Sequence, residues 1–162
     1  MKCPECGENM TKSRGDYDYS IVGLPVLLVN VELRLCPTHG LSPAIPRIEQ
    51  LHKMIAQGIV TKTSRLSGAE VKFLRKHIGW SGQDFARHIG VTPACVSRWE
   101  NDHEQIGEGS DRALRLMAII HEPVCDYPAI DALEMMAKIH GAPVVRKIKL
   151  KAERNDWVSI AL

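Results

Sequence analysis

The sequence predicts a mainly α-helical protein with a small β module at its N-terminal end and a β-hairpin at its C-terminal end. Three observations lead to this fold class. Two short Cys-containing motifs enclose a stretch rich in β-branched residues before residue 45. Short helical segments, opened by Ser or Thr and separated by Gly, follow between residues 67 and 101. From Val144 onward, apolar side chains recur with a different period around a polar turn.

The N-terminal motifs, Cys3-Pro4-Glu5-Cys6-Gly7 and Cys36-Pro37-Thr38-His39-Gly40, share one template. Pro opens and Gly closes each tight turn, so that two ligand atoms converge on a single ion without strain. Three thiolates and one imidazole suit tetrahedral zinc and leave no position open for water. The sequence therefore predicts a structural zinc ion held by the ligand set Cys3, Cys6, Cys36 and His39. We expect no enzyme, because the site is closed and no His-Glu-x-x-His motif is present.

Residues 1–45 are expected to form the zinc-binding β module. The segment is too short to bury a self-sufficient core, so zinc would contribute on the order of 10 kcal/mol of apparent folding free energy. The alternation from Val29 predicts a strand that delivers Cys36 beside the first motif. One face would carry Val29, Val31, Leu33 and Leu35, and the other Asn30, Glu32 and Arg34.

Residues 46–66 are expected to form a helix and a linker. Ile48, Leu51, Met54 and Ile55 recur at helical spacing, and Gly58 is expected to end the helix. His52 is interpreted as a solvent-facing residue. The polar stretch 61–65 is typical of a linker.

Residues 67–121 show the signals of a helix-turn-helix DNA-binding domain. Ser67, Ser81 and Thr92 can each cap a short helix, and Pro93 stands at the first helical position, where a missing N–H costs nothing. Three short helices with Gly90 in the sharpest turn describe a helix-turn-helix. A fourth helix is expected over 110–120. The shared core would be built by Phe85, Ala86, Ile89, Val91, Val96 and Trp99.

The outer face of the third short helix is the candidate DNA-reading surface. Arg98 is the leading candidate, because its planar guanidinium fits guanine O6 and N7 and gives about 1–3 kcal/mol of discrimination. A phosphate-only contact by Arg98 is the alternative. Pro93 and Ala94 are expected near a thymine methyl group, and Thr92 and Ser97 near phosphate or a base edge. The full set of expected DNA contacts is Gln83, Thr92, Pro93, Ala94, Ser97, Arg98 and Asn101.

Residues 122–162 are expected to add a helix, 129–140, and a β-hairpin with its turn at 153–156. An isolated hairpin is marginally stable, so it must pack on something, either a second copy or the zinc module. Arg146, Lys147, Lys149 and Lys151 give the hairpin a basic edge, which suits protection against edge pairing or contact with DNA.

Residues 67–120 resemble the Cro/repressor type of helix-turn-helix, in the pattern Leu74-Arg75, Gly79-Trp80-Ser81, Phe85-Ala86, Ile89-Gly90-Val91-Thr92 and Val96-Ser97-Arg98-Trp99-Glu100. With the zinc motifs ahead of them, residues 1–120 are similar to the MqsA-like family of zinc-finger antitoxins and related regulators. This resemblance implies a homodimer on palindromic operators, a zinc module that contacts a toxin, and an internal ion pair between Arg75 and Glu100. The family's phosphate-gripping Gln is replaced here by Gly82, so Gln83 or the backbone N–H groups would take over. Ala94 replaces a base-reading polar residue, so the operator sequence does not transfer.

The leading hypothesis is therefore a sequence-specific DNA-binding transcriptional repressor, an antitoxin that represses its own operon. The alternative is a phage-type or general regulator without a toxin partner, with the zinc module used for dimerisation or protein docking. Seven basic against three acidic side chains over residues 62–100 favour phosphate contact on a chain whose net charge is only +2. Neither a long apolar run nor a secretory leader is evident among the 162 residues, so we expect a cytoplasmic protein without membrane contact.

Overall fold

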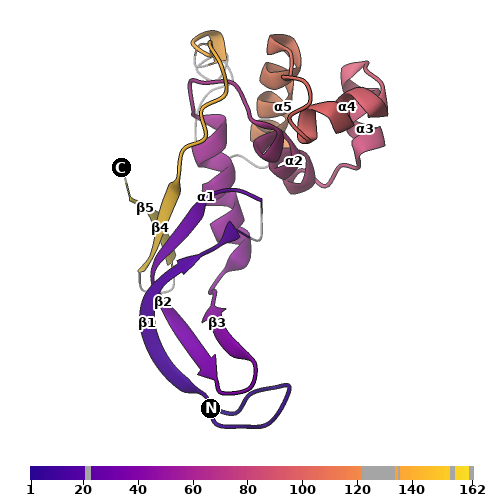
Figure 1. The fold of residues 1–162 in the computed structure, drawn as a ribbon. Coiled ribbons are helices and arrows are strands. Elements are labelled where there is room, and N and C mark those ends of the chain that lie inside the picture. Colours follow the sequence, from indigo (N-terminus) through magenta and orange to yellow (C-terminus); the bar gives the residue numbers. More distant parts are fainter. Residues whose placement is uncertain (21–22, 122–133, 135, 154–155, 161–162) are drawn as a thin grey trace.

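The computed structural model describes residues 1–20, 23–121, 134, 136–153 and 156–160. Within these ranges the strands are β1 (Thr11–Asp18), β2 (Val26–Cys36), β3 (Gly40–Ala44), β4 (Ile148–Glu153) and β5 (Asp156–Ser159). The helices are α1 (Ile48–Val60), α2 (Gly68–His77), α3 (Gly82–Ile89), α4 (Pro93–Glu100) and α5 (Glu108–His121). The sheet forms the lower part of the molecule in Figure 1, and α1 connects it to the bundle of α2–α5.

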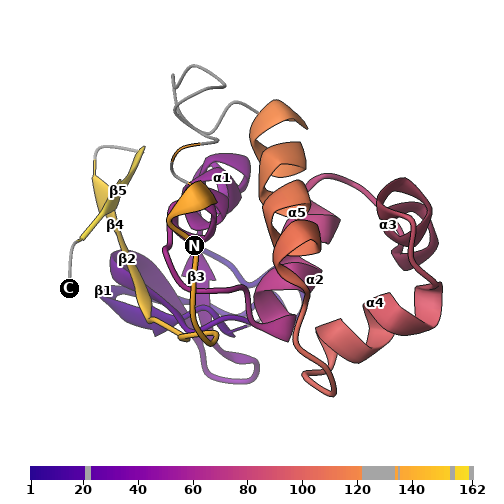
Figure 2. The ribbon, with the colours of Figure 1, turned by 90° about the horizontal axis from the view of Figure 1, so that it is seen from above.

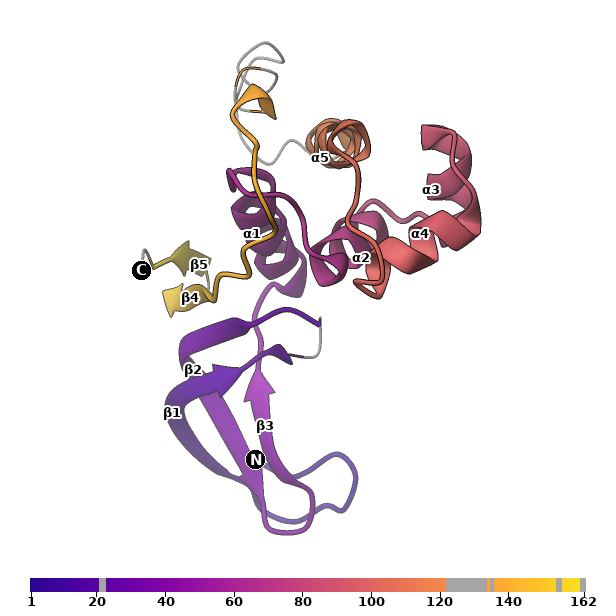
Figure 3. The same ribbon diagram turned by 45° about the horizontal axis from the view of Figure 1, so that its top comes forward.

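The expectation of a mainly α protein is only partly correct, because all five described strands form one sheet and the chain is a mixed α/β protein. β1 pairs antiparallel with one edge of β2. The other edge of β2 is shared: its first half pairs parallel with β4, and its second half pairs antiparallel with β3. The C-terminal hairpin β4–β5 therefore packs on the N-terminal strands, one of the two expected positions (Figure 3). Its first strand begins at Ile148 rather than at Val144, which is exposed.

The predicted face pattern of β2 is wrong at its start. Val31 and Leu33 are buried as expected, but the buried residues before them are Val26 and Leu28 rather than Val29. The alternation changes phase at Asn30, which has a φ of 58° and whose backbone N–H donates to Asp16 Oδ1 at 3.2 Å. Between the pairs Gly15–Val31 and Tyr17–Leu28, β2 contains one residue more than β1. This β-bulge keeps both halves of β2 facing the core.

Helix α1 covers the inner face of the sheet and continues to Val60, past Gly58. The expected end at Gly58 is therefore wrong. Ile59 and Val60, in the additional turn, are each 1% exposed, so the burial of two large side chains outweighs the cost of a Gly inside the helix. The indole Nε1 of Trp157 in β5 donates to Pro46 O at 2.8 Å and ties the hairpin to the entry of α1.

Helices α2, α3 and α4 begin at the caps that the sequence indicates. Ser67 and Ser81 form capping boxes with Glu70 and Asp84, and the side chain of Thr92 accepts from Cys95 N at 3.2 Å. Gly90 adopts a left-handed conformation at the end of α3. Val96 and Trp99 on the inner side of α4 are 1% and 5% exposed, and Trp99 meets the buried Phe85 edge to face at 6.5 Å. The three helices thus share one small core, which joins the core beneath the sheet.

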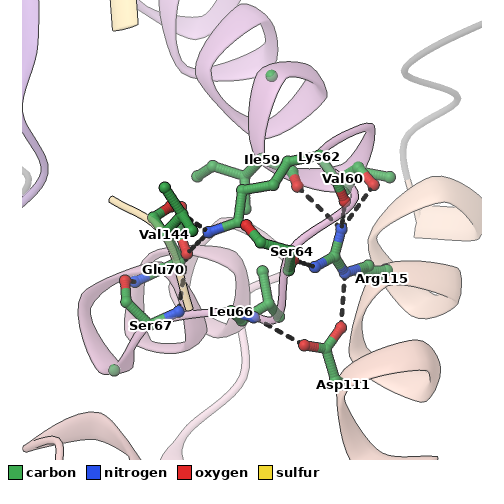
Figure 4. A network of polar contacts seen from close by, with 12 residues as sticks. Ile59, Val60, Lys62, Ser64, Leu66, Ser67, Glu70, Asp111, Arg115 and Val144 are labelled. Carbon is green, nitrogen blue, oxygen red and sulfur yellow. Dashed lines mark hydrogen bonds and ion pairs between the residues drawn. The ribbon is translucent and has the colours of Figure 1, made fainter. Parts of the chain in front are cut away.

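The segment after α1, expected to be a linker, is held in place by a buried polar network (Figure 4). Arg115 of α5 is fully buried and donates to the carbonyl groups of Val60, Lys62 and Ser64 at 2.6–2.9 Å and of Ile59 at 3.2 Å. Asp111 accepts from Arg115 Nε at 2.6 Å and from Leu66 N at 2.7 Å. The last carbonyls of α1 and the linker thus find donors in the helical bundle, which fixes the sheet and the bundle to each other.

Half of the expected helix over 129–140 lies outside the described residues. Of the other half, Glu134, Met136 and Ala137 are helical and 138–140 are not. None of the helices in the described ranges combines the length and apolarity that a membrane crossing requires.

Candidate metal centre and the α4 surface

The four predicted zinc ligands lie together at the tip of the sheet. Their ligand atoms, the three Sγ atoms and the His39 ring nitrogen, are all within 4.8 Å of one another. Cys6 Sγ and Cys36 Sγ are 3.5 Å apart, and His39 Nδ1 lies 3.5 Å from Cys3 Sγ and 3.7 Å from Cys36 Sγ. A tetrahedral zinc ion, with Zn–S bonds of about 2.3 Å and a Zn–N bond of about 2.0 Å, requires ligand separations of about 3.5–3.8 Å. The cluster therefore has the donor set and spacing to hold a metal ion such as zinc.

Local backbone geometry explains why the ligands meet. Gly7 and Gly40 have φ values of 75° and 78°, a conformation that other residues rarely adopt. In the first motif Gly7 N donates to Cys3 O at 2.9 Å, which closes the turn. The second motif is the turn between β2 and β3, with Cys36 paired to Gly40. Cys3 and Cys36 are buried, whereas Cys6 and His39 face solvent.

The four candidate ligands differ in how readily they lose a proton. Backbone hydrogen bonds from Cys6 and Glu5 lower the pKa of the Cys3 thiol to about 6, and one from His39 lowers the pKa of Cys36. A backbone bond at Glu8 acts to lower the pKa of Cys6, but desolvation and the neighbouring thiols raise it to about 11. Contacts with Cys36 and Cys3 raise the pKa of His39. Backbone donors aimed at two sulfurs thus favour thiolates, the form that binds a metal.

Two carboxylates surround the cluster and were not anticipated from the sequence. Glu5 Oε2 lies 3.2 Å from His39 Nε2, so the ring is oriented with Nδ1 toward the thiols. Glu8 Oε2 accepts from Thr38 Oγ1 at 2.6 Å and lies 3.6 Å from Cys6 Sγ. Carboxylates that accept from a metal-bound His fix its tautomer and strengthen binding. The presence of Glu5 inside the first motif is the one sequence signal that could have indicated this role.

All seven residues expected to contact DNA are exposed: Gln83, Thr92, Pro93, Ala94, Ser97, Arg98 and Asn101. Five of them lie on the outer side of α4 or at its end, opposite the buried Val96 and Trp99. Asn101 Nδ2 donates to Ser97 O at 2.7 Å, and Thr92 is engaged in its cap. In Figure 2, α4 lies on the far side of the molecule from β4 and β5, with α1 and α5 between them.

Arg98 forms an exposed ion pair with Glu104, in which Nε and Oε2 are 2.9 Å apart. Its side chain is 53% exposed, and that of Glu104 is 50% exposed. Pairs of this kind contribute no more than about 1 kcal/mol, so a stronger acceptor can replace Glu104. Five of the seven basic side chains counted above carry a paired carboxylate, which makes the surface of α2–α4 less basic than the count indicates. These are Lys62, Arg65, Arg75, Arg87 and Arg98.

Arg75 and Glu100 form a bidentate ion pair inside the bundle. The Nε–Oε1 distance is 2.5 Å and the Nη2–Oε2 distance is 3.1 Å, and Arg75 Nη1 also donates to Trp80 O at 2.6 Å. Both side chains are about nine-tenths buried, at 10% and 9% exposure. The pair thus joins α2 to the end of α4.

His52 is not the solvent-facing residue that the sequence suggests. Its Nε2 lies 3.1 Å from the hydroxyl of the buried Tyr19, and its ring meets Phe73 edge to face. Desolvation, and to a smaller extent the nearby His77, lower its pKa. His52 therefore packs from α1 against Tyr19, which follows β1, and Phe73 of α2.

The fold and the cluster together define a mixed α/β protein with a candidate metal centre at the tip of its sheet and an exposed helix, α4, on the opposite part of the molecule. Comparison of the chain with protein-family models, with curated proteins and with solved structures finds no match.

Proposed function

We propose that the protein is a sequence-specific DNA-binding transcriptional repressor that reads the major groove with α4 and carries a structural zinc ion. The observation that carries this proposal is the two-sided character of α4. Its inner side is buried against α2 and α3, whereas its outer side is open from Pro93 to Asn101. A short helix held on a rigid bundle after a three-residue turn is the arrangement with which helix-turn-helix proteins enter the major groove.

The zinc ion has a structural role in this proposal. The four ligands fill a tetrahedral shell, which leaves no open position for a substrate. The centre also lies at the tip of the sheet, away from the exposed side of α4 (Figure 1). It would therefore stabilise the sheet rather than take part in DNA recognition.

An antitoxin setting is the form of repression that the family resemblance suggests, and a regulator without a toxin is the alternative. The two differ in one respect that can be observed. A short reading frame beside the gene, whose product co-purifies with this chain, would support the antitoxin setting; purification of the chain alone from its native source would favour the alternative.

Substitution of Arg98 by Ala tests base reading. We expect the Arg98→Ala variant to bind each half of the preferred site about 5- to 150-fold more weakly. The reason is that a bidentate Arg–guanine contact gives about 1–3 kcal/mol of discrimination. The preferred site is first selected from a pool of random duplexes, and affinities are then measured for that site and for a shuffled one. The matched control is Arg87→Ala, which removes an exposed Arg of α3 that pairs with Asp84. An unchanged ratio of specific to non-specific affinity in Arg98→Ala would remove Arg98 from base reading.

Salt dependence tests phosphate contact separately. We expect log K to fall with log[salt] at a slope of about −3.6 or steeper, which corresponds to release of counterions from about four or more phosphates. A Lys149→Gln variant is the control, because β4 lies on the other side of the molecule from α4 (Figure 2) and its slope should be unchanged. A flat dependence, or no duplex enriched above background, would contradict the proposed function.

A further inference from the structure

Strand β1 lies at the edge of the sheet, with one side paired to β2 and the other side open. The strand order places β1 at one end, and no strand in the described part of the chain pairs with its outer edge. Figure 3 shows it along the outside of the N-terminal strands. β1 is eight residues long, and all of its residues except Gly15 and Tyr17 are exposed. An open edge of this length is a template for pairing with another strand.

The charged residues of β1 lie on one face in an ordered row. Since the bulge is in β2, β1 itself keeps its alternation. Lys12 and Arg14 pair with Arg34 and Glu32, and Asp18 pairs with Leu27, all on the face of the sheet opposite the core. Asp16 falls on the same face by its position between them. The row therefore reads Lys12, Arg14, Asp16, Asp18, with two positive charges followed by two negative charges.

We propose that β1 pairs antiparallel with β1 of a second copy of this chain, about a two-fold axis at Gly15. In this register Lys12 lies opposite Asp18 of the partner subunit, and Arg14 lies opposite Asp16 of the partner subunit. The axis repeats each contact, so four ion pairs form. Directly opposite side chains on one face of an antiparallel pair are about 4.5–5.5 Å apart at Cβ, which allows these contacts. The two sheets join into one, with the α1 helices on the same face.

The order of charges in the row favours this register over the two adjacent antiparallel registers and over parallel pairing. A shift of the partner by one pair in either direction places Arg14 opposite itself or Asp16 opposite itself, and like charges directly opposite each other are destabilising. Parallel pairing in register also places every charge opposite itself. A row built only to discourage pairing needs no such order, because charges of one sign suffice.

Three of the four charged residues of the row form no ion pair within the described part of one copy. Arg14, Asp16 and Asp18 form no ion pair with any residue in the described ranges; Asp16 accepts only the backbone N–H of Asn30. Lys12 makes a loose contact with Glu32 at 3.5 Å, and its side chain is 53% exposed. Other exposed charges, such as Arg98 and Arg87, do have partners at 2.9–3.1 Å. This inference is independent of DNA binding, because it concerns the opposite part of the molecule.

The test is the oligomeric state of two complementary charge variants of the full-length, zinc-loaded chain. The acidic variant carries Lys12→Glu and Arg14→Glu, and the basic variant carries Asp16→Lys and Asp18→Lys. We expect the wild type to form dimers at about 0.05 M salt that dissociate toward about 1 M, where the Debye length falls to about 3 Å. Each variant alone should be monomeric, and an equimolar mixture should give heterodimers. Sedimentation and native mass spectrometry distinguish these species.

A control variant with Lys72→Glu and Lys76→Glu changes the charge by the same amount as the acidic variant, but at exposed residues of α2, and it should dimerise as the wild type does. If the double substitutions impair folding, the single variants Lys12→Glu and Asp18→Lys replace them. Each should dimerise less than the wild type, and their mixture should recover dimers. A monomeric wild type at low salt would overturn the proposal. So would dimers of either variant alone, because they would require another interface, or a mixture that fails to form heterodimers.

Discussion

Chelation of the metal is expected to unfold the tip of the sheet and to leave the helical bundle folded. Little else stabilises the tip, because Leu35 and Leu41, its large apolar residues, are 47% and 49% exposed. Structural zinc in small peptides contributes on the order of 10 kcal/mol of apparent folding free energy at neutral pH. The loss should stay local to residues 1–10 and 36–41, because β2 up to Leu33 packs against the core under α1.

Hydrogen exchange before and after chelation measures this directly. The amides of Cys3 and Gly7, which donate to Glu8 O and Cys3 O in the first motif, should lose protection. The amides of Val71 and Phe85 in the bundle should keep theirs. Cys36→Ser should abolish stoichiometric zinc, whereas Cys95→Ser, which changes a cysteine of α4 outside the cluster, should retain one ion per chain. Unchanged protection at Cys3 and Gly7 after complete metal removal would show that the tip does not depend on the ion.

Features set by local chemistry could be predicted from the sequence. The capping residues Ser67, Ser81 and Thr92 each act within their own turn, so the starts of α2, α3 and α4 follow from a few neighbouring residues. The cluster of Cys3, Cys6, Cys36 and His39 was predictable for the same reason, since each motif is a closed turn. The metal site depends on one long-range step only, the strand that brings Cys36 back to Cys3.

Features that depend on non-local packing were missed. The phase change in β2 follows from the left-handed Asn30, and strict alternation gives no sign of a bulge. The end of α1 depends on the parts of the chain that bury Ile59 and Val60, and the sequence of the helix alone does not indicate them. The parallel pairing of β4 with β2 joins residues more than a hundred positions apart in the sequence. The number of strands in the sheet could therefore not be predicted from the N-terminal segment.

The buried network around Arg115 is the clearest such case. Asp111 and Arg115 are spaced as an ordinary exposed i, i+4 pair, and the stretch 61–65 is polar, so both patterns indicate a solvated surface. In the structure both side chains of the pair are 0% exposed, and Arg115 donates to the last carbonyls of α1 and to those of the following segment (Figure 4). The same residue types thus serve at a surface or in a core, and only the fold decides between the two.

We expect substitution of Arg115 by Met to lower the free energy of unfolding by about 3–5 kcal/mol, because it leaves the buried Asp111 carboxylate without its cation. The carbonyl groups of Val60, Lys62 and Ser64 also lose their donor. Denaturant unfolding followed by circular dichroism measures the change. The matched control is Arg112→Met on the same helix: its side chain is 42% exposed and contacts Glu108 only at 3.9 Å, so the expected change is below about 1 kcal/mol.

A double substitution separates the charge effect from lost packing. If the unpaired carboxylate causes most of the loss, Asp111→Leu combined with Arg115→Met should recover part of the stability, because replacing both members of a buried pair is less costly than removing one. Recovery should be incomplete, since Leu66 N then lacks the acceptor that Asp111 Oδ2 provides. A loss below about 1 kcal/mol in Arg115→Met would mean that water or neighbouring groups satisfy the network, and that the connection between sheet and bundle does not depend on this pair.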